Sequence, residues 1–473
     1  MAHLRCLSAR AAPRRRYSGA MTIAAQRYAV ALSCWVGLAI VSTSYAQAPS
    51  PSLPANPAPQ PVLSRLVEQA VGNHPSVQAK LAELGGSQAS LDSAQWQYYP
   101  AFSVQTERGA NQTNQAAPNT GSTTLRLQQT LWAGGRLDAG TRNAEFKQQA
   151  AQQALQETRT TAALRTVEAW QGLLTAQGRQ QATQRLLDQM ARLSSMMERR
   201  VEQQVSPAID AQLLRARLAQ AQSEYLSAQS GADAARQRLV QWTGDKALSA
   251  MALRPVTTAA GTPSAAMQSY EALPTWPTET AQRLDAAPLR SASVLRLEAD
   301  IQAASEEVRQ KQAELWPSVY ARVDRQFTDS GSFFGKTAST TAYVGLQYTL
   351  GAGLSSRSQV EVAQAKVHSL QSEREALLRQ IQDNYASEWR DYQATLERIQ
   401  YAQLVQTSNA TILDSYTRLF VAGRRSWLEL LNTLREQNAA EQALTDLQAQ
   451  QQAGFFRLRL YLGELAWQAR ALP

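Results

Sequence analysis

Two stretches of the chain alternate apolar and polar residues with a period of two. They are residues 122–132 (STTLRLQQTLW) and 340–350 (TTAYVGLQYTL). Such alternation is typical of a β-strand that has one apolar and one polar face. Each stretch follows a shorter run that begins at Pro100 or Pro317, so the pattern predicts four strands in two pairs. The apolar face would carry Leu125, Leu127, Val344 and Leu346, and the polar face Arg126, Gln128, Thr341 and Gln347.

Most of the remaining chain is predicted to be long helices, which makes the fold class mainly α. No proline occurs from residue 119 to 206, nor from 318 to 472. We expect helices over 136–200 and 354–422, which at 1.5 Å per residue are about 97 and about 103 Å long. Four segments are roughly half as long: 62–97, 208–242, 281–315 and 426–462. Two of these stacked end to end would match one long helix, and frequent Ala, Leu and Gln suit close helix packing.

The chain also repeats itself. Thr130, Leu131, Ala133 and Gly134 recur as Thr349, Leu350, Ala352 and Gly353, each 219 residues later. We predict a tandem duplication with a proline-rich lead at 47–61, a first repeat at 62–245, a connection at 246–280, a second repeat at 281–464 and a tail at 465–473. The turns between strands and long helices would use Gly134, Gly135, Gly351 and Gly353, because glycine allows a sharp change of backbone direction.

The first 46 residues have the features of an export signal. A flank with several Arg residues precedes an apolar core at 28–41, and the small-residue site ending at Ala46 suits a signal peptidase. A transmembrane anchor is the alternative, but 14 apolar residues are short for a span of about 20. The start could be Met1 or Met21, and cleavage could follow Ala46 or Ala48.

Removal of this signal would change the charge and the cysteine content. Both cysteines, Cys6 and Cys34, would be lost together with six Arg, so that 47 less six leaves 41 basic residues against 38 acidic ones. A mature charge near +3 gives no reason to expect nucleic-acid binding. The mature chain would carry neither a disulfide nor a lipid-modified cysteine.

Four amphipathic strands in one chain cannot close a barrel, and lipid does not tolerate open strand edges. Three chains would supply twelve strands, which can close. Aromatic residues stand near the predicted strand ends: Trp96, Tyr98, Tyr99, Trp132 and Trp316. Such residues are typical of the two membrane–water interfaces, although capping of helical cores is an alternative role.

Several short stretches occur in a specific order: NHP at 73–75, the proline entries to the strands, LWAGG at 131–135 and RLFVAGRRSWLELLNT at 418–433. In this order and spacing the chain resembles the TolC-like outer-membrane channel proteins of Gram-negative bacteria. The resemblance implies a homotrimer with a short twelve-stranded β-barrel in the outer membrane and a long α-helical barrel in the periplasm. It also implies contact with outer-membrane lipid, and partners in a periplasmic adaptor protein and an inner-membrane transporter.

In the TolC-like family, acidic side chains on inward-curling helix pairs narrow the periplasmic entrance. The family pattern, aromatic-x-x-Gly-x-Arg-x-x-x-Asp-x-x-Asp, falls here on Phe420, Gly423, Arg425, Glu429 and Asn432, and the acid of the first repeat falls on Asp210. The resemblance therefore implies a gate at these residues, with a single acidic ring where relatives can have two. We call the end of the helices that carries the 205–207 turn and the 420–432 turn the tip. We expect Arg425 to form a hydrogen bond or ion pair across this tip, to Asp210 or to carbonyls of the 205–207 turn, within or between protomers. The alternative for each charge is a solvated helix face.

Groups that could support enzyme chemistry are sparse. Beyond the signal the histidines are His74 and His368, far apart and without a cysteine, so a metal site of the usual His/Cys kind is not expected. GSFFGKT at 331–337 resembles a phosphate-binding loop but has three residues between its glycines instead of four. We expect neither an enzyme nor a bound cofactor.

Three functions remain after these exclusions. The first is a passive exit channel for proteins in type I secretion, favoured because many drug-efflux relatives carry a lipid-anchored cysteine and the mature chain would not. The second is a channel for multidrug efflux. The third is a periplasmic coiled-coil scaffold or adaptor, which explains the helices but not the four amphipathic strands.

Overall fold

The structure is a computed structural model that describes residues 62–109, 120–245, 276, 280–329, 336–349, 355–465 and 468. All of them belong to one compact unit, Pro59–Pro473. Several predicted features lie outside the described residues: the signal at 1–46, the lead at 47–61, Gly351, Gly353, and most of the 246–280 connection and of the 465–473 tail.

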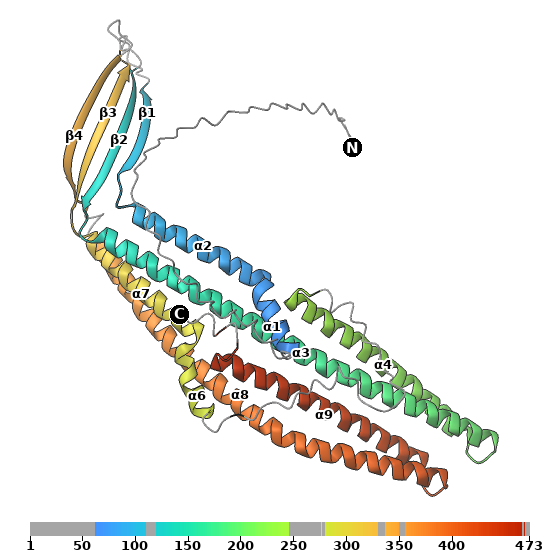
Figure 1. Cartoon of the computed structure of the whole chain (residues 1–473). Coiled ribbons are helices and arrows are strands. Elements are labelled where there is room, and N and C mark those ends of the chain that lie inside the picture. Colours follow the sequence, from blue (N-terminus) through green and yellow to red (C-terminus); the bar gives the residue numbers. More distant parts are fainter. Residues whose placement is uncertain are drawn as a thin grey trace, which may run out of the picture. The chain divides into compact units, whose positions relative to one another are not determined.

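The helices and strands follow the same order in both halves of the chain (Figure 1). The first half contains α1 (Val62–Asn73), α2 (Pro75–Trp96), β1 (Ala101–Gly109), β2 (Thr120–Trp132), α3 (Arg136–Glu202) and α4 (Ala208–Thr243). The second half contains α6 (Thr280–Ala286), η1 (Ala287–Arg290), α7 (Ala292–Ala313), β3 (Ser318–Asp329), β4 (Lys336–Gln347), α8 (Ser355–Val421) and α9 (Trp427–Leu462). The predicted fold class, mainly helical with four strands, is confirmed.

The two long helices, α3 and α8, are flanked by shorter helices placed end to end, as Figure 1 shows. Each long helix has 67 residues, about 100 Å at 1.5 Å per residue. Helices α2 and α4 pack along α3, whereas α7 and α9 pack against both α3 and α8. The result is a helical wall in which α3 and the α7–α9 pair form the middle, and α8 and the α2–α4 pair form the two edges.

Two segments predicted as single helices are broken in the structure. The 62–97 segment breaks at His74, because Pro75 at the first turn of α2 has no N–H and His74 adopts an extended backbone. The His74 ring accepts the Ser76 N–H and stacks on Trp242 of α4, with ring centroids 4.5 Å apart. In the second half, the 3₁₀ turn η1, which contains Pro288, interrupts the 281–315 segment in the same way.

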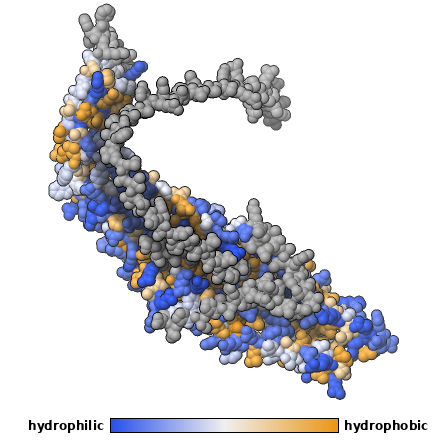
Figure 2. Space-filling model, in the orientation of Figure 1, coloured by the Kyte–Doolittle hydropathy of each residue, from blue (hydrophilic) through white to orange (hydrophobic). Residues whose placement is uncertain are grey.

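The four strands form one antiparallel sheet in the order β1-β2-β3-β4. Leu127 of β2 pairs with Phe102 of β1 and with Val323 of β3. The next residue, Arg126, pairs with Ser103 and Asp324, whose side chains are on the opposite face. This register confirms which predicted residues share each face. Figure 2 shows apolar residues gathering over part of the sheet.

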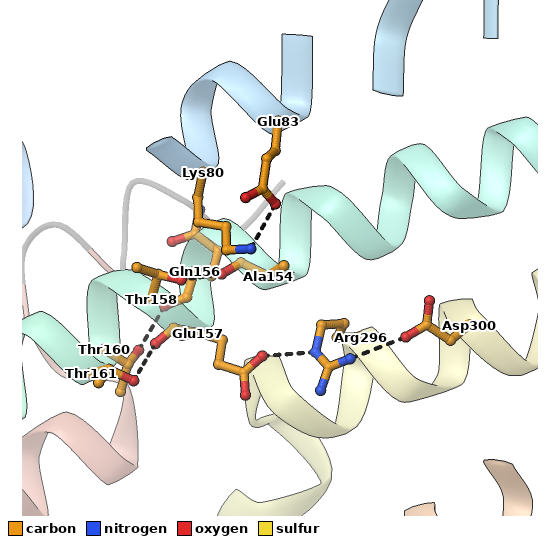
Figure 3. Close-up of polar contacts among 10 residues, drawn as sticks. All are labelled: Lys80, Glu83, Ala154, Gln156, Glu157, Thr158, Thr160, Thr161, Arg296 and Asp300. Atoms are coloured by element: carbon orange, nitrogen blue, oxygen red, sulfur yellow. Dashed lines mark hydrogen bonds and ion pairs between the residues drawn. The ribbon is translucent and has the colours of Figure 1, made fainter. Parts of the chain in front are cut away.

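Charged side chains join α3 to α7 inside the wall (Figure 3). Arg296 of α7 donates from Nε to Glu157 of α3 at 2.8 Å and from Nη1 to Asp300 at 3.2 Å. Burial raises the pKa of Asp300, although Arg296 opposes this shift. Lower along the wall, Tyr385 and Tyr461 stack at 4.1 Å, and burial raises the pKa of Tyr461 to about 12.

The turn from β2 into α3 depends on two glycines with left-handed backbones. Gly134 has φ +60°, and a Cβ there would lie 3.0 Å from Cβ of Trp316 and 3.2 Å from the carbonyl oxygen of Ala313. Gly135 has φ +84°, and a Cβ there would meet no atom within 4 Å. The turn is therefore packed on one side and open on the other.

We predict that Gly134→Ala and Gly135→Ala each lower the free energy of unfolding by about 1–2 kcal/mol, because alanine is disfavoured in the left-handed region. Gly134→Ala should be the more harmful of the two, since only there does the added methyl group also meet Trp316. Thermal unfolding of the two variants side by side checks this order. Equal losses would mean that the contact with Trp316 has no effect.

Candidate functional site

The first tip turn joins α3 to α4 across residues 203–207. Gln204 has a left-handed backbone with φ 59°, and the N–H groups of Val205 and Ser206 both donate to the carbonyl of Arg200. Pro207 then starts α4 in an extended conformation. Asp210 lies half-buried in the first turn of α4, where the positive end of the helix dipole favours a carboxylate.

The second tip turn joins α8 to α9 and repeats the backbone geometry of the first turn. Gly423 supplies the left-handed residue with φ 72°, and the Arg424 N–H donates to the carbonyl of Leu419 at 2.9 Å. Ser426 caps α9, since its hydroxyl accepts the Glu429 N–H at 3.3 Å. Glycine explains the turn here, whereas the first turn reaches the same conformation with Gln204.

The two turns contact each other through Phe420. Its ring is buried, and the guanidinium of Arg200 lies over it at 5.2 Å. Behind it, one apolar cluster joins the ends of α3, α4, α8 and α9. This cluster includes Met197, Leu214, Trp427 and Leu431. Phe420 therefore acts as packing between the turns, and a cation–π contact strengthens that packing.

Arg425 does not form the predicted bond across the tip within one copy of the chain. Its guanidinium pairs with Glu429 at 3.3 Å and lies over the ring of Tyr416 at 4.8 Å. The reason is local: Arg425 directly precedes the cap of α9 and Glu429 is in the first turn of that helix, so the two side chains meet without reaching Asp210. A bond between copies of the chain stays a prediction. Asn432 is exposed one turn further along α9.

The five predicted interface aromatics lie where helices meet strands. Trp96 ends α2, Trp132 ends β2 and Trp316 lies between α7 and β3. All five are exposed, with Trp96 at 67%: Trp96, Tyr98, Tyr99, Trp132 and Trp316. The Tyr98 hydroxyl donates to Asp138 at the start of α3, which orients one of them. Their placement at the membrane–water boundary stays a prediction.

The polar face of the sheet holds residues that the sequence reasoning missed. Arg126 was expected there, but Arg322 and Asp324 of β3 lie beside it, and Tyr320 and Tyr343 flank them. The missed signal is the alternation in SVYARVDRQF at 318–327, where every second residue from Tyr320 to Gln326 belongs to this face. That run directly follows Pro317, and in this half of the chain the prediction of strand faces covers only the later stretch at 340–350.

Among the described residues, no group of three or more His, Cys, Asp or Glu side chains could hold a metal ion. No helix within the described ranges is both long and apolar enough to cross a membrane.

Comparison with known proteins places the chain in a family. The outer membrane efflux protein family matches residues 66–245 and 284–464. Solved structures share the fold at low sequence identity. The outer-membrane channel OprN is 20% identical with a TM-score of 0.68, and the match covers 86% of this chain and 90% of OprN.

Two further structures agree with this match. VceC from Vibrio cholerae is 17% identical with a TM-score of 0.66, and the match covers 85% of this chain and 95% of VceC. The open MtrE channel of Neisseria gonorrhoeae is 14% identical with a TM-score of 0.66, covering 85% and 89%. Comparison with curated protein sequences gives no significant match. Since the family match spans most of both halves, the chain belongs to the outer membrane efflux protein family: it is an outer-membrane efflux channel protein that extends into the periplasm, and not an enzyme.

Proposed function

We propose that three copies of the chain assemble into one passive channel. The observation that carries this proposal is the sheet: among the described residues its outer strands, β1 and β4, are each paired along one edge only, and one of its faces is apolar. Unpaired edges are not tolerated in lipid, so β4 of one copy would pair with β1 of the next. Three copies then give a closed barrel of twelve strands with its apolar face toward lipid.

The edges of the helical wall support the same assembly. Helix α8 exposes Tyr401 and Leu404, and helix α4 exposes Ile209 and Leu226, all at 57% or more. These helices lie on opposite edges of the wall, so the edge of one copy can cover that of the next. Burial of these side chains would add to the stability of a trimer.

An inner-membrane transporter and a periplasmic adaptor would deliver the substrate to the channel. We favour secreted proteins as that substrate, because the expected mature chain has no cysteine for a lipid anchor. Small-molecule efflux is the second candidate, and the description of the matched family as efflux proteins supports it. Deleting the gene separates the two: loss of a secreted protein from the medium supports the first, and accumulation of dyes or antibiotics supports the second.

The assembly itself can be tested on the purified protein. We expect a trimer in outer-membrane fractions that resists SDS and dissociates on boiling, and we expect single channels in planar bilayers. A monomeric protein recovered from the soluble periplasm would contradict the proposal and would favour the scaffold alternative.

We predict that the tip is a gate, and that Arg425→Ser combined with Asp210→Ala raises single-channel conductance. Arg425 holds Tyr416 and Glu429 in place, so its loss should free the second turn. An exposed pair is worth only about 0–1 kcal/mol, but three copies repeat it, and a small bias can shift a two-state tip.

The matched control for this prediction is Arg418→Ser. Arg418 pairs with Asp414 within α8 at 2.6 Å. The Arg418→Ser substitution therefore removes a similar exposed ion pair that lies near the tip but outside the turn. Its conductance should equal that of the wild type. Unchanged conductance in the Arg425 and Asp210 double variant would place the gate elsewhere.

A further inference from the structure

A compact charged cluster lies on the polar face of the sheet. Asp324 of β3 accepts a hydrogen bond from Nε of Arg126 on β2 at 3.0 Å. Its other oxygen lies 3.1 Å from Nε of Arg322, an ion pair without hydrogen-bond geometry. The Asp324 side chain is only 14% exposed, so one carboxylate is enclosed between two guanidinium groups.

Two tyrosines hold Arg322 in place. Its guanidinium lies 4.7 Å from the ring of Tyr343 and 6.0 Å from the ring of Tyr320. The end of the Tyr320 ring occupies the space beside Gly345, since a Cβ at that glycine would be 2.5 Å from Cζ of the ring. The glycine thus makes room for the tyrosine, and the arginine is confined between two aromatic faces.

The cluster has unused hydrogen-bonding capacity and a positive excess. An arginine carries five N–H donors, and Asp324 is the only carboxylate among the described residues that pairs with Arg126 or Arg322. The positions paired with Arg126 and Asp324 on the outer strands, Ser103 and Thr341, are uncharged, and the next acid on this face, Glu107 of β1, pairs with Ser122, four residues along β2 from Arg126. Two guanidinium groups and one carboxylate leave one net positive charge in each copy of the chain.

We propose that this cluster is a binding and selectivity site for aromatic organic anions inside the sheet region of the channel. The proposal rests on the trimer proposed above, which turns the polar face toward the lumen and repeats the cluster three times. A ring of arginines favours anions in a pore. The free Nη groups suit a carboxylate or sulfonate, and the tyrosine faces suit a flat ring.

At the helical tip, one of the two predicted acids, Glu429, has a cation beside it, and Asp210 is the other. Glu429, the expected acidic ring, is already paired with Arg425 in its own turn. The inference therefore places charge selection at the sheet cluster, whereas the resemblance implied an acidic ring at the tip.

The test uses the full-length protein in planar bilayers, with naphthalene trisulfonate as the probe on the side to which the sheet opens. The wild-type channel should show voltage-dependent block by this anion. Arg322→Gln and Arg126→Gln should each weaken the block by about tenfold, the size expected for the loss of a hydrogen bond to a charged group. Both should also shift the reversal potential in a KCl gradient toward the potassium potential.

Arg325→Gln is the matched control. Arg325 is on the same strand but on the opposite, apolar face, where its guanidinium lies 5.3 Å from the ring of Phe327. Its loss removes the same charge and should leave block and reversal potential unchanged. Arg322→Lys should keep the reversal potential but weaken the block, because lysine cannot form the planar fork. Asp324→Asn should strengthen the block, which gives a test in the opposite direction.

Each outcome separates this inference from the trimer proposal. If the wild-type protein forms no channels, the trimer proposal fails. If channels form but Arg322→Gln is blocked as strongly as the wild type, while its SDS-resistant trimer is intact, the selectivity site does not exist. Equal effects of Arg322→Gln and Arg325→Gln would also overturn it, because the effect would then be one of general charge.

Discussion

Leu127→Arg is expected to cost about 2–4 kcal/mol and to prevent stable assembly in the outer membrane. Leu127 is at the middle of the sheet, between Phe102 and Val323 on the apolar face, and is 46% exposed in one copy of the chain. An arginine there would enter the lipid core at a depth where the cost of a charge is greatest. The measurement is the yield of SDS-resistant trimer in outer-membrane fractions.

The register decides which residue makes the sharpest test. Leu346 belongs to the same face but pairs with Val319, the second residue of β3, so it lies close to the helical end of the sheet. Near an interface the cost of an arginine falls to about 0–1 kcal/mol. Thr124→Arg, on the polar face of β2, is the control and should assemble normally. Normal assembly of Leu127→Arg would mean that this face does not meet lipid.

Gly178→Ala is expected to lower the free energy of unfolding by about 3 kcal/mol. Gly178 is buried where α3 packs on α9, and a Cβ there would lie 1.9 Å from Cγ2 of Thr445. Moving the two helices apart to make room would also disturb the ion pairs that flank the contact, Arg179 with Asp446 at 2.8 Å and Arg185 with Glu441. The urea midpoint of the purified protein, followed by tryptophan fluorescence, measures the loss.

A second glycine of α3 provides the control for this prediction. A Cβ at Gly172 would meet no atom within 4 Å, so Gly172→Ala should be neutral or stabilise by up to about 1 kcal/mol, since alanine is the better helix former. Thr445→Ser removes the Cγ2 that clashes, and adding it to Gly178→Ala should recover part of the loss. If Gly178→Ala lowered the free energy of unfolding no more than Gly172→Ala, then α3 and α9 could accommodate the added methyl group without a clash.

The secondary structure and the faces of the strands could be read from the sequence because both are local. Two proline-free runs predicted α3 and α8 to within a few residues, since a helix needs only neighbours along the chain. A period of two placed Leu127 and Arg126 on opposite faces for the same reason. Even the missed residues of β3 obey this alternation.

Contacts between residues that are far apart in the chain could not be predicted from the sequence. The alternation put Arg126 on the polar face, but only the pairing of β2 with β3 brings Asp324 to it, 198 residues away. The same holds for Gly178 and Thr445, whose close approach depends on how α3 and α9 cross. At the tip, Arg425 pairs with Glu429 and not with Asp210, because Glu429 is only four residues away whereas Asp210 belongs to another helix. Periodicity therefore determined the elements and their faces, whereas the packing of distant segments, which depends on side-chain shape and charge, determined the partners.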